Sequence, residues 1–295
     1  MEKATLNYRL VKKIKDDKFD VDGLHHYNLS IQIGDTDFQV CIADANSNQC
    51  LLLEDYILND VDSSDELIDI ISSLFDNHHL LKAGFWSTVK VSLKNPKFTL
   101  VPENLFQKES LPDYLKLNCT LDPVKEELNY YKQIKSDAVG VFSGDKNLLD
   151  WLRSVYPNIT LQVIHQTNAL IEGVLSYEDH TDAKSMFIFT DRNNLTIIVA
   201  ANKKLIYCNK FVYNTTNAFL KYVFTVFQLQ ELDQHNSKVH IWGNINTQSP
   251  QFKELYKYFK QISFGGKPSY LKFNYMFDEA EDHQYFDLYN TFLCQ

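Results

Sequence analysis

The chain has 295 residues, of which 44% are hydrophobic, so it can bury a substantial core and is long enough for two domains of roughly 150 residues each. Its formal net charge of −9 at pH 7 argues against a general nucleic-acid or anionic-membrane surface, because such surfaces need clustered Lys and Arg. The five cysteines are scattered and form no CxxC pair, which argues against a disulfide framework or a zinc site and indicates a reducing compartment.

The N-terminus gives no targeting or membrane signal. Residues 1–20 lack an apolar segment of the signal-peptide kind, and no later stretch approaches the roughly 18 apolar residues that a membrane span requires. We therefore expect a cytoplasmic protein that does not insert into a membrane. Residues 1–26 are predicted to be a solvated N-terminal arm, because the lysines of this segment are interleaved with aspartates.

The first half opens with a predicted antiparallel meander of three strands, separated by turn-forming residues. An N-cap signal at Ser63 or Ser64 then precedes apolar residues at helical spacing. The half ends with two strands of the buried type, each followed by a helix. This order of elements is typical of parallel crossover units. In chain order we expect strands over 27–34, 38–44, 49–58, 87–93, 97–101, 138–143 and 159–165, and helices over 64–79, 111–117, 148–155 and 168–176.

The same order of elements recurs after a polar break at 177–184. Three strand-like runs lead into a helix with one apolar stripe, and further strands and helices follow, ending in an aromatic-rich strand and a closing helix. The expected elements are strands over 185–191, 194–201, 203–213, 238–243 and 270–277, and helices over 215–232 and 252–259. A three-strand meander that feeds a helix therefore occurs twice in this chain.

This duplication resembles the superfamily of actin, heat-shock chaperones and sugar kinases, whose two halves close over a nucleotide. The resemblance covers most of residues 25–295. It implies an α/β, actin-like ATPase fold of the ribonuclease H-like type, with duplicated βββαβα-type halves over 27–180 and 181–295 and a cleft between them. The pilus-assembly, cell-division and secretion branch is the most similar in pattern. The chain also resembles an uncharacterised Bacteroidetes family of unknown function with this fold.

The first predicted hairpin, residues 31–42, matches the phosphate loop of that superfamily in spacing. The resemblance places the metal-ordering acid of the family at Gln32, and it keeps a glycine at Gly34, followed by Asp35 and Thr36. A neutral amide can accept a hydrogen bond from a hydrated metal ion, but it supplies no charge to hold the ion.

The second predicted hairpin departs further from the family pattern. Its acid position becomes Phe189, and its glycines become Asp191 and the neighbouring Asn193 and Asn194. A carboxylate at this place repels a polyphosphate, and only glycine would permit the close approach of backbone to phosphate. ATP binding of the usual kind is therefore disfavoured at both loops.

The strand predicted near 239–245 resembles the adenosine motif of the family, with Gly243 kept and Asn244 in place of a second glycine. Together the eroded motifs define a candidate degenerate nucleotide cleft, with no cofactor expected. Its residues are Gln32, Gly34, Asp35, Thr36, Asp191, Asn193, Asn194, Gly243 and Asn244.

No catalytic or metal-binding residue is predicted. The histidine pairs at 25–26 and 78–79 have no carboxylate or Cys at ligand spacing, so a solvated or capping role is expected. His165, at a strand end, is expected to be a core or rim histidine rather than a pocket residue. Ser143 and Gly144 lack a nucleophile elbow, and an ordinary helix start with Asp145 as N-cap is expected there.

Two functions follow from this pattern. The first is a non-enzymatic, actin-like binding or scaffold module with protein partners, no nucleic acid and a possible oligomeric state. The second is a divergent ATPase or kinase that binds ATP and Mg²⁺ in the inter-domain cleft, with Asp35, Asp37 or Asp191 replacing the missing acids. The loss of family residues at both hairpins favours the first.

Overall fold

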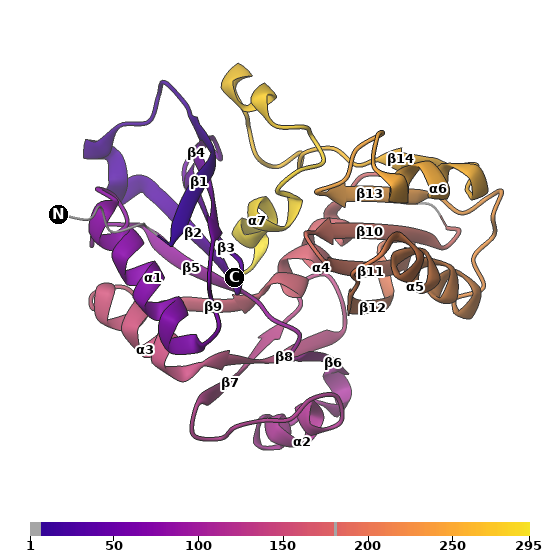
Figure 1. Cartoon of the computed structure of the whole chain (residues 1–295), viewed down its shortest axis with the longest axis horizontal. Coiled ribbons are helices and arrows are strands. Elements are labelled where there is room, and N and C mark those ends of the chain that lie inside the picture. The colour runs from indigo at the N-terminus through magenta and orange to yellow at the C-terminus, as the bar shows by residue number, and fades with distance from the viewer. Residues whose placement is uncertain (1–6, 180–181) are drawn as a thin grey trace. The chain divides into compact units, whose positions relative to one another are not determined.

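The computed structural model describes residues 7–179 and 182–295, and the chain divides into two compact units (Figure 1). Unit 1 contains the chain up to Lys132 together with Ala138–Asn168 and Tyr270–Glu279. Unit 2 contains Gln133–Asp137, Ala169–Ser269 and Ala280–Gln295. The domain boundary predicted at 180/181 falls on the two residues outside the described part of the chain and stays a prediction.

A six-stranded sheet forms the centre of unit 1. The predicted meander is confirmed, and its three antiparallel strands occupy the middle of the sheet. Two later strands extend the sheet in parallel from β2, and an N-terminal strand pairs antiparallel with β4 at the other edge. Across the sheet the order is β1 (Tyr8–Lys15), β4 (Cys50–Leu58), β3 (Asp37–Asp44), β2 (Tyr27–Gly34), β5 (Thr88–Lys94) and β9 (Gln162–His165).

The two faces of this sheet differ in polarity because successive side chains of a strand point to opposite sides. On one face Phe38 packs against Phe75 of α1 (Ser64–Asn77), and Phe75 packs against Trp151 of α3 (Lys146–Val155). Helix α1 begins as predicted, since the Ser63 side chain accepts a hydrogen bond from the backbone N–H of Glu66. On the opposite face the polar side chains of Gln32, Gln39 and Ser92 form hydrogen bonds.

A separate three-stranded antiparallel sheet lies between β5 and α3 in the chain. Its order is β6 (Phe98–Pro102), β8 (Ala138–Asp145) and β7 (Glu126–Lys132), and its apolar core also contains residues of α2 (Leu111–Lys116). The predicted parallel crossover through 138–165 is therefore wrong, because β8 pairs with β6 and β7 and only β9 joins the central sheet.

Unit 2 is built on a five-stranded sheet whose core contains residues of two helices, α5 and α6. In chain order its strands are β10 (Ser185–Asp191), β11 (Asn194–Ala201), β12 (Lys204–Val212), β13 (Val239–Gly243) and β14 (Ile262–Phe264). Its helices are α5 (Thr216–Leu229), α6 (Pro250–Tyr258) and α7 (Phe286–Asn290), and α4 (Gln166–Ser176) leads into this unit from unit 1.

The duplication read from the sequence is confirmed by strand order. The first sheet runs β4-β3-β2-β5-β9 and the second runs β12-β11-β10-β13-β14, with the fourth strand parallel to the third in both. In each unit a helix, α1 or α5, connects the meander to that fourth strand. The small sheet of β6, β7 and β8 is inserted in the first copy only, because β13 passes through α6 alone to reach β14.

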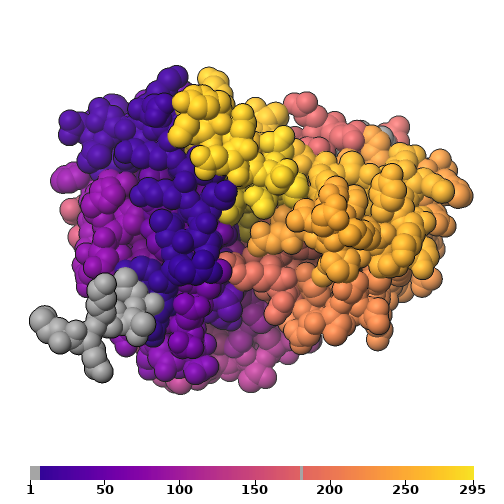
Figure 2. All heavy atoms as spheres, turned by 45° about the horizontal axis from the view of Figure 1, so that its top comes forward, coloured from indigo at the N-terminus to yellow at the C-terminus, as the bar shows by residue number. Residues whose placement is uncertain are grey.

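Two sequence predictions differ from the structure at the ends of the chain. The strand expected over 270–277 is wrong: within this segment Lys272 makes a single parallel bridge to Gln49, and a short 3-10 helix spans Tyr275–Glu279. The predicted N-terminal arm contains β1, which forms part of the surface of unit 1 (Figure 2). Among the described residues, none of the helices has both the length and the apolar character needed to cross a bilayer.

Candidate functional site

The acid position of the first hairpin is part of a buried chain of hydrogen bonds. Ser92 Oγ donates to Gln32 Oε1 over 2.9 Å, and Gln32 Nε2 donates to Gln39 Oε1 over 3.1 Å. Gln39 Nε2 donates in turn to Asp55 Oδ1 over 3.2 Å. Gln32 is fully buried. The amide of Gln32 therefore both accepts and donates within the central sheet, which is the usual requirement for a buried polar group.

Gly34 lies beneath an ion pair between its two neighbouring strands. In the sheet it is paired with Lys94 of β5, and Asp37 begins β3 on its other side. Lys94 Nζ forms an ion pair with Asp37 Oδ2, and each side chain is only 4% exposed. A Cβ at position 34 would clash with Asp37 Oδ1. Gly34 thus permits the contact between Asp37 and Lys94, while Asp35 and Thr36 form the exposed tip of the hairpin.

The second hairpin is closed by contacts within unit 2. Asp191 is buried, and its Oδ1 lies 3.5 Å from Nη1 of Arg192, which has a positive φ of 53°. The hydroxyl of Tyr213 donates to the carbonyl of Arg192 over 3.0 Å, and the Tyr213 N–H donates to the carbonyl of Asn193 over 2.8 Å. Asn194 pairs with Asp191 in the sheet. These contacts fix the turn to the end of β12.

The segment predicted to resemble the adenosine motif is bonded to the C-terminal segment of the same unit. The N–H of Gly243 donates to the carbonyl of His283 over 2.7 Å, and the N–H of Asn244 donates to the carbonyl of Thr190 over 2.8 Å. Gly243 has a φ of 95°, and a Cβ there would clash with Thr190. Phe286 stacks on the neighbouring Trp242 at 4.6 Å. Both N–H groups are thus engaged internally.

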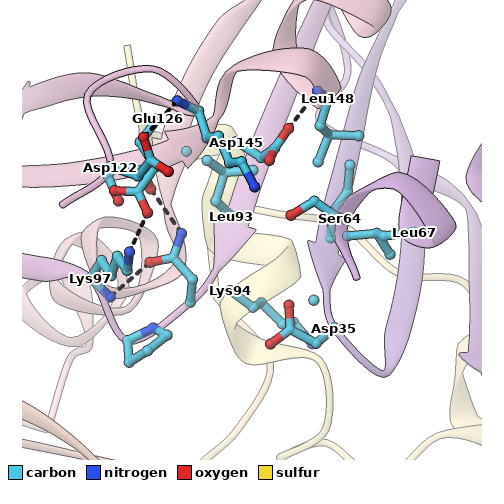
Figure 3. A pocket seen from close by; sticks show the side chains of 17 residues that line it. Asp35, Ser64, Leu67, Leu93, Lys94, Lys97, Asp122, Glu126, Asp145 and Leu148 are labelled. Carbon is cyan, nitrogen blue, oxygen red and sulfur yellow. Dashed lines mark hydrogen bonds and ion pairs between the residues drawn. The ribbon is translucent and has the colours of Figure 1, made fainter. Parts of the chain in front are cut away.

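A pocket of about 410 Å³ lies wholly within unit 1, at the carboxyl ends of β2 and β5 (Figure 3). Open α/β sheets commonly bind ligands at this edge. In Figure 3, Leu93 lies between Ser64 and Leu67 of α1 on one side and the polar side chains of β7 and its preceding loop on the other. The lining residues are Ile33, Gly34, Asp35, Ser64, Leu67, Leu93, Lys94, Asn95, Pro96, Lys97, Asp122, Lys125, Glu126, Ser143, Gly144, Asp145 and Leu148.

Side-chain bridges hold the walls of this pocket in place. Asn95 Nδ2 donates to the carbonyl of Ser143 over 2.8 Å, and Asn95 Oδ1 accepts from the N–H of Lys97 over 2.8 Å. His165 Nε2 lies 2.9 Å from the Asn95 carbonyl, while its Nδ1 accepts from the N–H of Thr167. His165 is buried, as predicted, and it does not line the pocket but contacts the wall residue Asn95. The pocket is therefore preorganised.

Most charged side chains of the lining either belong to an ion pair or are acidic. Lys94 is paired with Asp37, and Lys97 with Glu126. Asp145 caps α3 as predicted, by accepting from the N–H of Leu148 over 2.9 Å. The lining carboxylates, which are Asp35, Asp122, Glu126 and Asp145, outnumber the lining ammonium groups, which are Lys94, Lys97 and Lys125. This balance disfavours a polyphosphate and suits a neutral or cationic ligand.

Both histidine pairs named in the sequence analysis lie at the C-terminal end of a helix. His78 caps the C-terminus of α1, which agrees with the predicted capping role, and the rings of His25 and His26 lie 3.8 Å apart in a tilted arrangement. Within residues 7–179 and 182–295, no group of three or more His, Cys, Asp or Glu side chains could hold a metal ion.

The two hairpins could be located from the sequence, but the pocket as a whole could not. Gln32, Gly34, Asp35 and Thr36 lie together in unit 1, and the remaining candidate residues lie in unit 2. Their role in binding a nucleotide stays a prediction. The lining residues of the pocket come from many separate parts of the chain, so no local motif marks it. Two of the predicted site residues, Gly34 and Asp35, line the pocket, and so do Ser143 and Gly144, at the end of a strand that leads into a helix.

The fold agrees with the comparisons with known proteins. The chain has the actin-like ATPase fold. A Bacteroides thetaiotaomicron protein described as having an actin-like ATPase fold and unknown function aligns at 20% identity, with a TM-score of 0.79 and coverage of 94% of this chain and 99% of that one. The PilM–PilN type IV pilus biogenesis complex contains a chain that aligns at 11% identity and a TM-score of 0.60, over 90% of this chain and 97% of that one.

Residues 16–262 match the profile of the family described as protein of unknown function DUF3822, and the chain belongs to that family. No curated protein matches the chain significantly.

Proposed function

We propose that this protein is a non-enzymatic, actin-like scaffold that captures a segment of a partner protein in the unit 1 pocket. The main observation behind the proposal is that the groups expected to bind phosphate or its metal ion already contact other residues of the same chain. Gln32 is hydrogen-bonded to Ser92 and Gln39, Asp37 is paired with Lys94, and the Gly243 N–H is bonded to the carbonyl of His283. A divergent ATPase would need Asp35, Asp37 or Asp191 to order a metal ion, and Asp37 is already committed to an ammonium group.

The pocket lining indicates the chemistry of the captured segment. Ile33, Leu67, Leu93 and Leu148 offer an apolar surface for one large side chain, and the excess of carboxylates favours a neighbouring Lys or Arg. PilM, which shares this fold, is described in a complex with PilN, so the fold is compatible with capture of a partner protein. The five cysteines all lie in the described residues and form no disulfide with one another, which suits a cytoplasmic setting. We infer that the scaffold works there without bound nucleotide or metal.

A peptide selection tests this proposal. Random peptides displayed on phage are selected against the wild-type protein and then measured by fluorescence anisotropy. We expect enriched sequences to carry an apolar anchor beside Lys or Arg and to bind with micromolar affinity. Ser64→Trp places a large side chain at the exposed rim of the pocket and should weaken binding at least tenfold. Thr225→Trp, on an exposed position of α5, is the matched control and should bind as the wild type does.

Two results would count against the proposal. If the selected peptides bind Ser64→Trp as tightly as the wild type, the pocket is not their binding site. Failure to enrich any peptide, combined with measurable binding of ATP and Mg²⁺, would favour the divergent ATPase or kinase instead.

A further inference from the structure

Two cysteines meet inside the hairpin that β3 and β4 form in unit 1. The Sγ atoms of Cys41 and Cys50 lie 3.5 Å apart, and both residues are fully buried and in the thiol form. In a disulfide the two sulfur atoms are about 2.05 Å apart, so a bond requires these two to approach by roughly 1.5 Å. The two thiols therefore lie within reach of one another on neighbouring strands.

The backbone beside this pair is irregular and close to solvent. The register of β3 and β4 shifts next to Ala43, which pairs with Cys50, and Leu51 is left as an extra residue on β4. Such a bulge bends its strand and interrupts the ladder of hydrogen bonds. Cys50 is also the first residue of β4 and follows an exposed turn over 45–48. Local opening of this turn exposes the Cys50 thiol without unfolding the sheet.

We propose that Cys41 and Cys50 are a modification site for hydrogen peroxide, which oxidises them to a reversible disulfide across the hairpin. The Cys50 thiolate attacks one peroxide oxygen, the O–O bond breaks, and a sulfenic acid and one water are formed. The Cys41 sulfur then attacks the Cys50 sulfur, and the second water leaves as the S–S bond forms. The two thiols lose two electrons and two protons, and one peroxide is reduced to two waters.

The pair differs in place and chemistry from the pocket. Neither cysteine lines the pocket, so the inference goes beyond the proposed partner capture and does not depend on it. In the reducing setting proposed above both thiols stay reduced, and disulfides of cytosolic proteins form mainly as transient responses to oxidation. The new bond closes the β3–β4 hairpin covalently, which restricts the unfolded chain.

Cleavage before aspartate locates the bond, because Asp44 lies between the two cysteines. The folded wild-type protein is treated with hydrogen peroxide, its remaining thiols are alkylated in denaturant, and it is digested with an aspartate-specific endoproteinase. We expect fragments 37–43 and 44–54 to be recovered joined and to separate when the digest is reduced, which distinguishes a disulfide from missed cleavage. Cys119→Ala should give the same joined fragments, whereas Cys50→Ala should give none.

The wild-type digest decides the proposal even if a variant fails to fold. Recovery of the two fragments separately, with Cys41 and Cys50 alkylated or oxidised only to sulfinic acid, would overturn it. A disulfide that links either residue to Cys119, Cys208 or Cys294 instead would overturn it as well. Joined fragments that appear while those three thiols are still open to alkylation would establish the pair as the preferred site of oxidation.

Discussion

Gly34 lies between Asp37 and Lys94 on three adjacent strands, and its missing side chain allows these two charged groups to meet. We predict that Gly34→Ala lowers the free energy of unfolding by about 3 kcal/mol, because the added Cβ would clash with Asp37 Oδ1 and separate a buried ion pair. Chemical denaturation measures this loss. Gly84→Ala is the matched control, since nothing lies within 4 Å of the added Cβ there. Equal effects of the two substitutions would contradict the role given to Gly34.

At the residue scale, the sequence located the hairpin positions but not their contacts. The spacing of Gln32 and Gly34 places both on the first hairpin, and the structure agrees. That Gln32 contacts Ser92 depends on the register of β2 against β5, which are 60 residues apart in the chain. Local sequence does not specify such a register, so Gly34 resembled a phosphate-loop glycine although its Cα faces an internal carboxylate.

At the scale of elements, Glu54 connects the edge strand β1 with the end of α1. Its side chain is fully buried on β4, where Oε1 lies 2.8 Å from Lys13 Nζ of β1, and Oε2 lies 2.7 Å from both His78 Nε2 and the Tyr56 hydroxyl. Because His78 Nδ1 accepts from the N–H groups of Leu80 and Leu81, the ring proton lies on Nε2 and is donated to Glu54. Burial opposes the charge of Glu54, but the contacts with His78, Lys13 and Tyr56 outweigh it and lower its pKa from 4.5 to about 2.

This lowered pKa predicts how stability depends on pH. The folded-state pKa lies below the unfolded value, so the unfolded chain binds the proton more readily and the stabilisation is lost as pH falls from about 4.5 to about 2. Above that pH window, the ionised Glu54 contributes about 3 kcal/mol to the free energy of unfolding. In urea unfolding, the difference in the free energy of unfolding between wild type and Glu54→Gln should have its full value at pH 7 and should be smaller at pH 3. Glu109→Gln, at an exposed position, should show no such trend. A gap that stayed constant from pH 7 to pH 3 would refute the assignment.

Elements with regular apolar patterns could be predicted, and elements with mixed patterns could not. The meanders and the helices α1 and α5 carry strong periodicity and N-cap signals, and all of them are present. Strands β1 and β7 were missed because their sequences, YRLVKKIK and EELNYYK, are rich in charged residues at the edge of a sheet. The aromatic alternation over 270–277 suggested a strand, but this segment has a single bridge and no strand partner.

For the whole molecule, the repeated order of elements was the property most readable from sequence. Two meanders that each feed a helix and a parallel strand give two sheets of the same strand order, which makes the actin-like resemblance specific. The inserted sheet of β6, β7 and β8 breaks that repeat in unit 1, and it supplies the pocket wall that contains Glu126 and Ser143. The candidate site therefore depends on the part of the chain that the duplication does not predict.

We propose that this protein acts without a nucleotide, and isothermal titration calorimetry of the purified protein with ATP and Mg²⁺ tests this proposal most directly. Because Gln32, Asp37 and the Gly243 N–H are all engaged within their own units, we predict no heat of binding and no shift of the unfolding temperature with ATP. Binding with a micromolar Kd, about −8 kcal/mol, would contradict the claim and would identify the protein as a nucleotide-binding member of its fold.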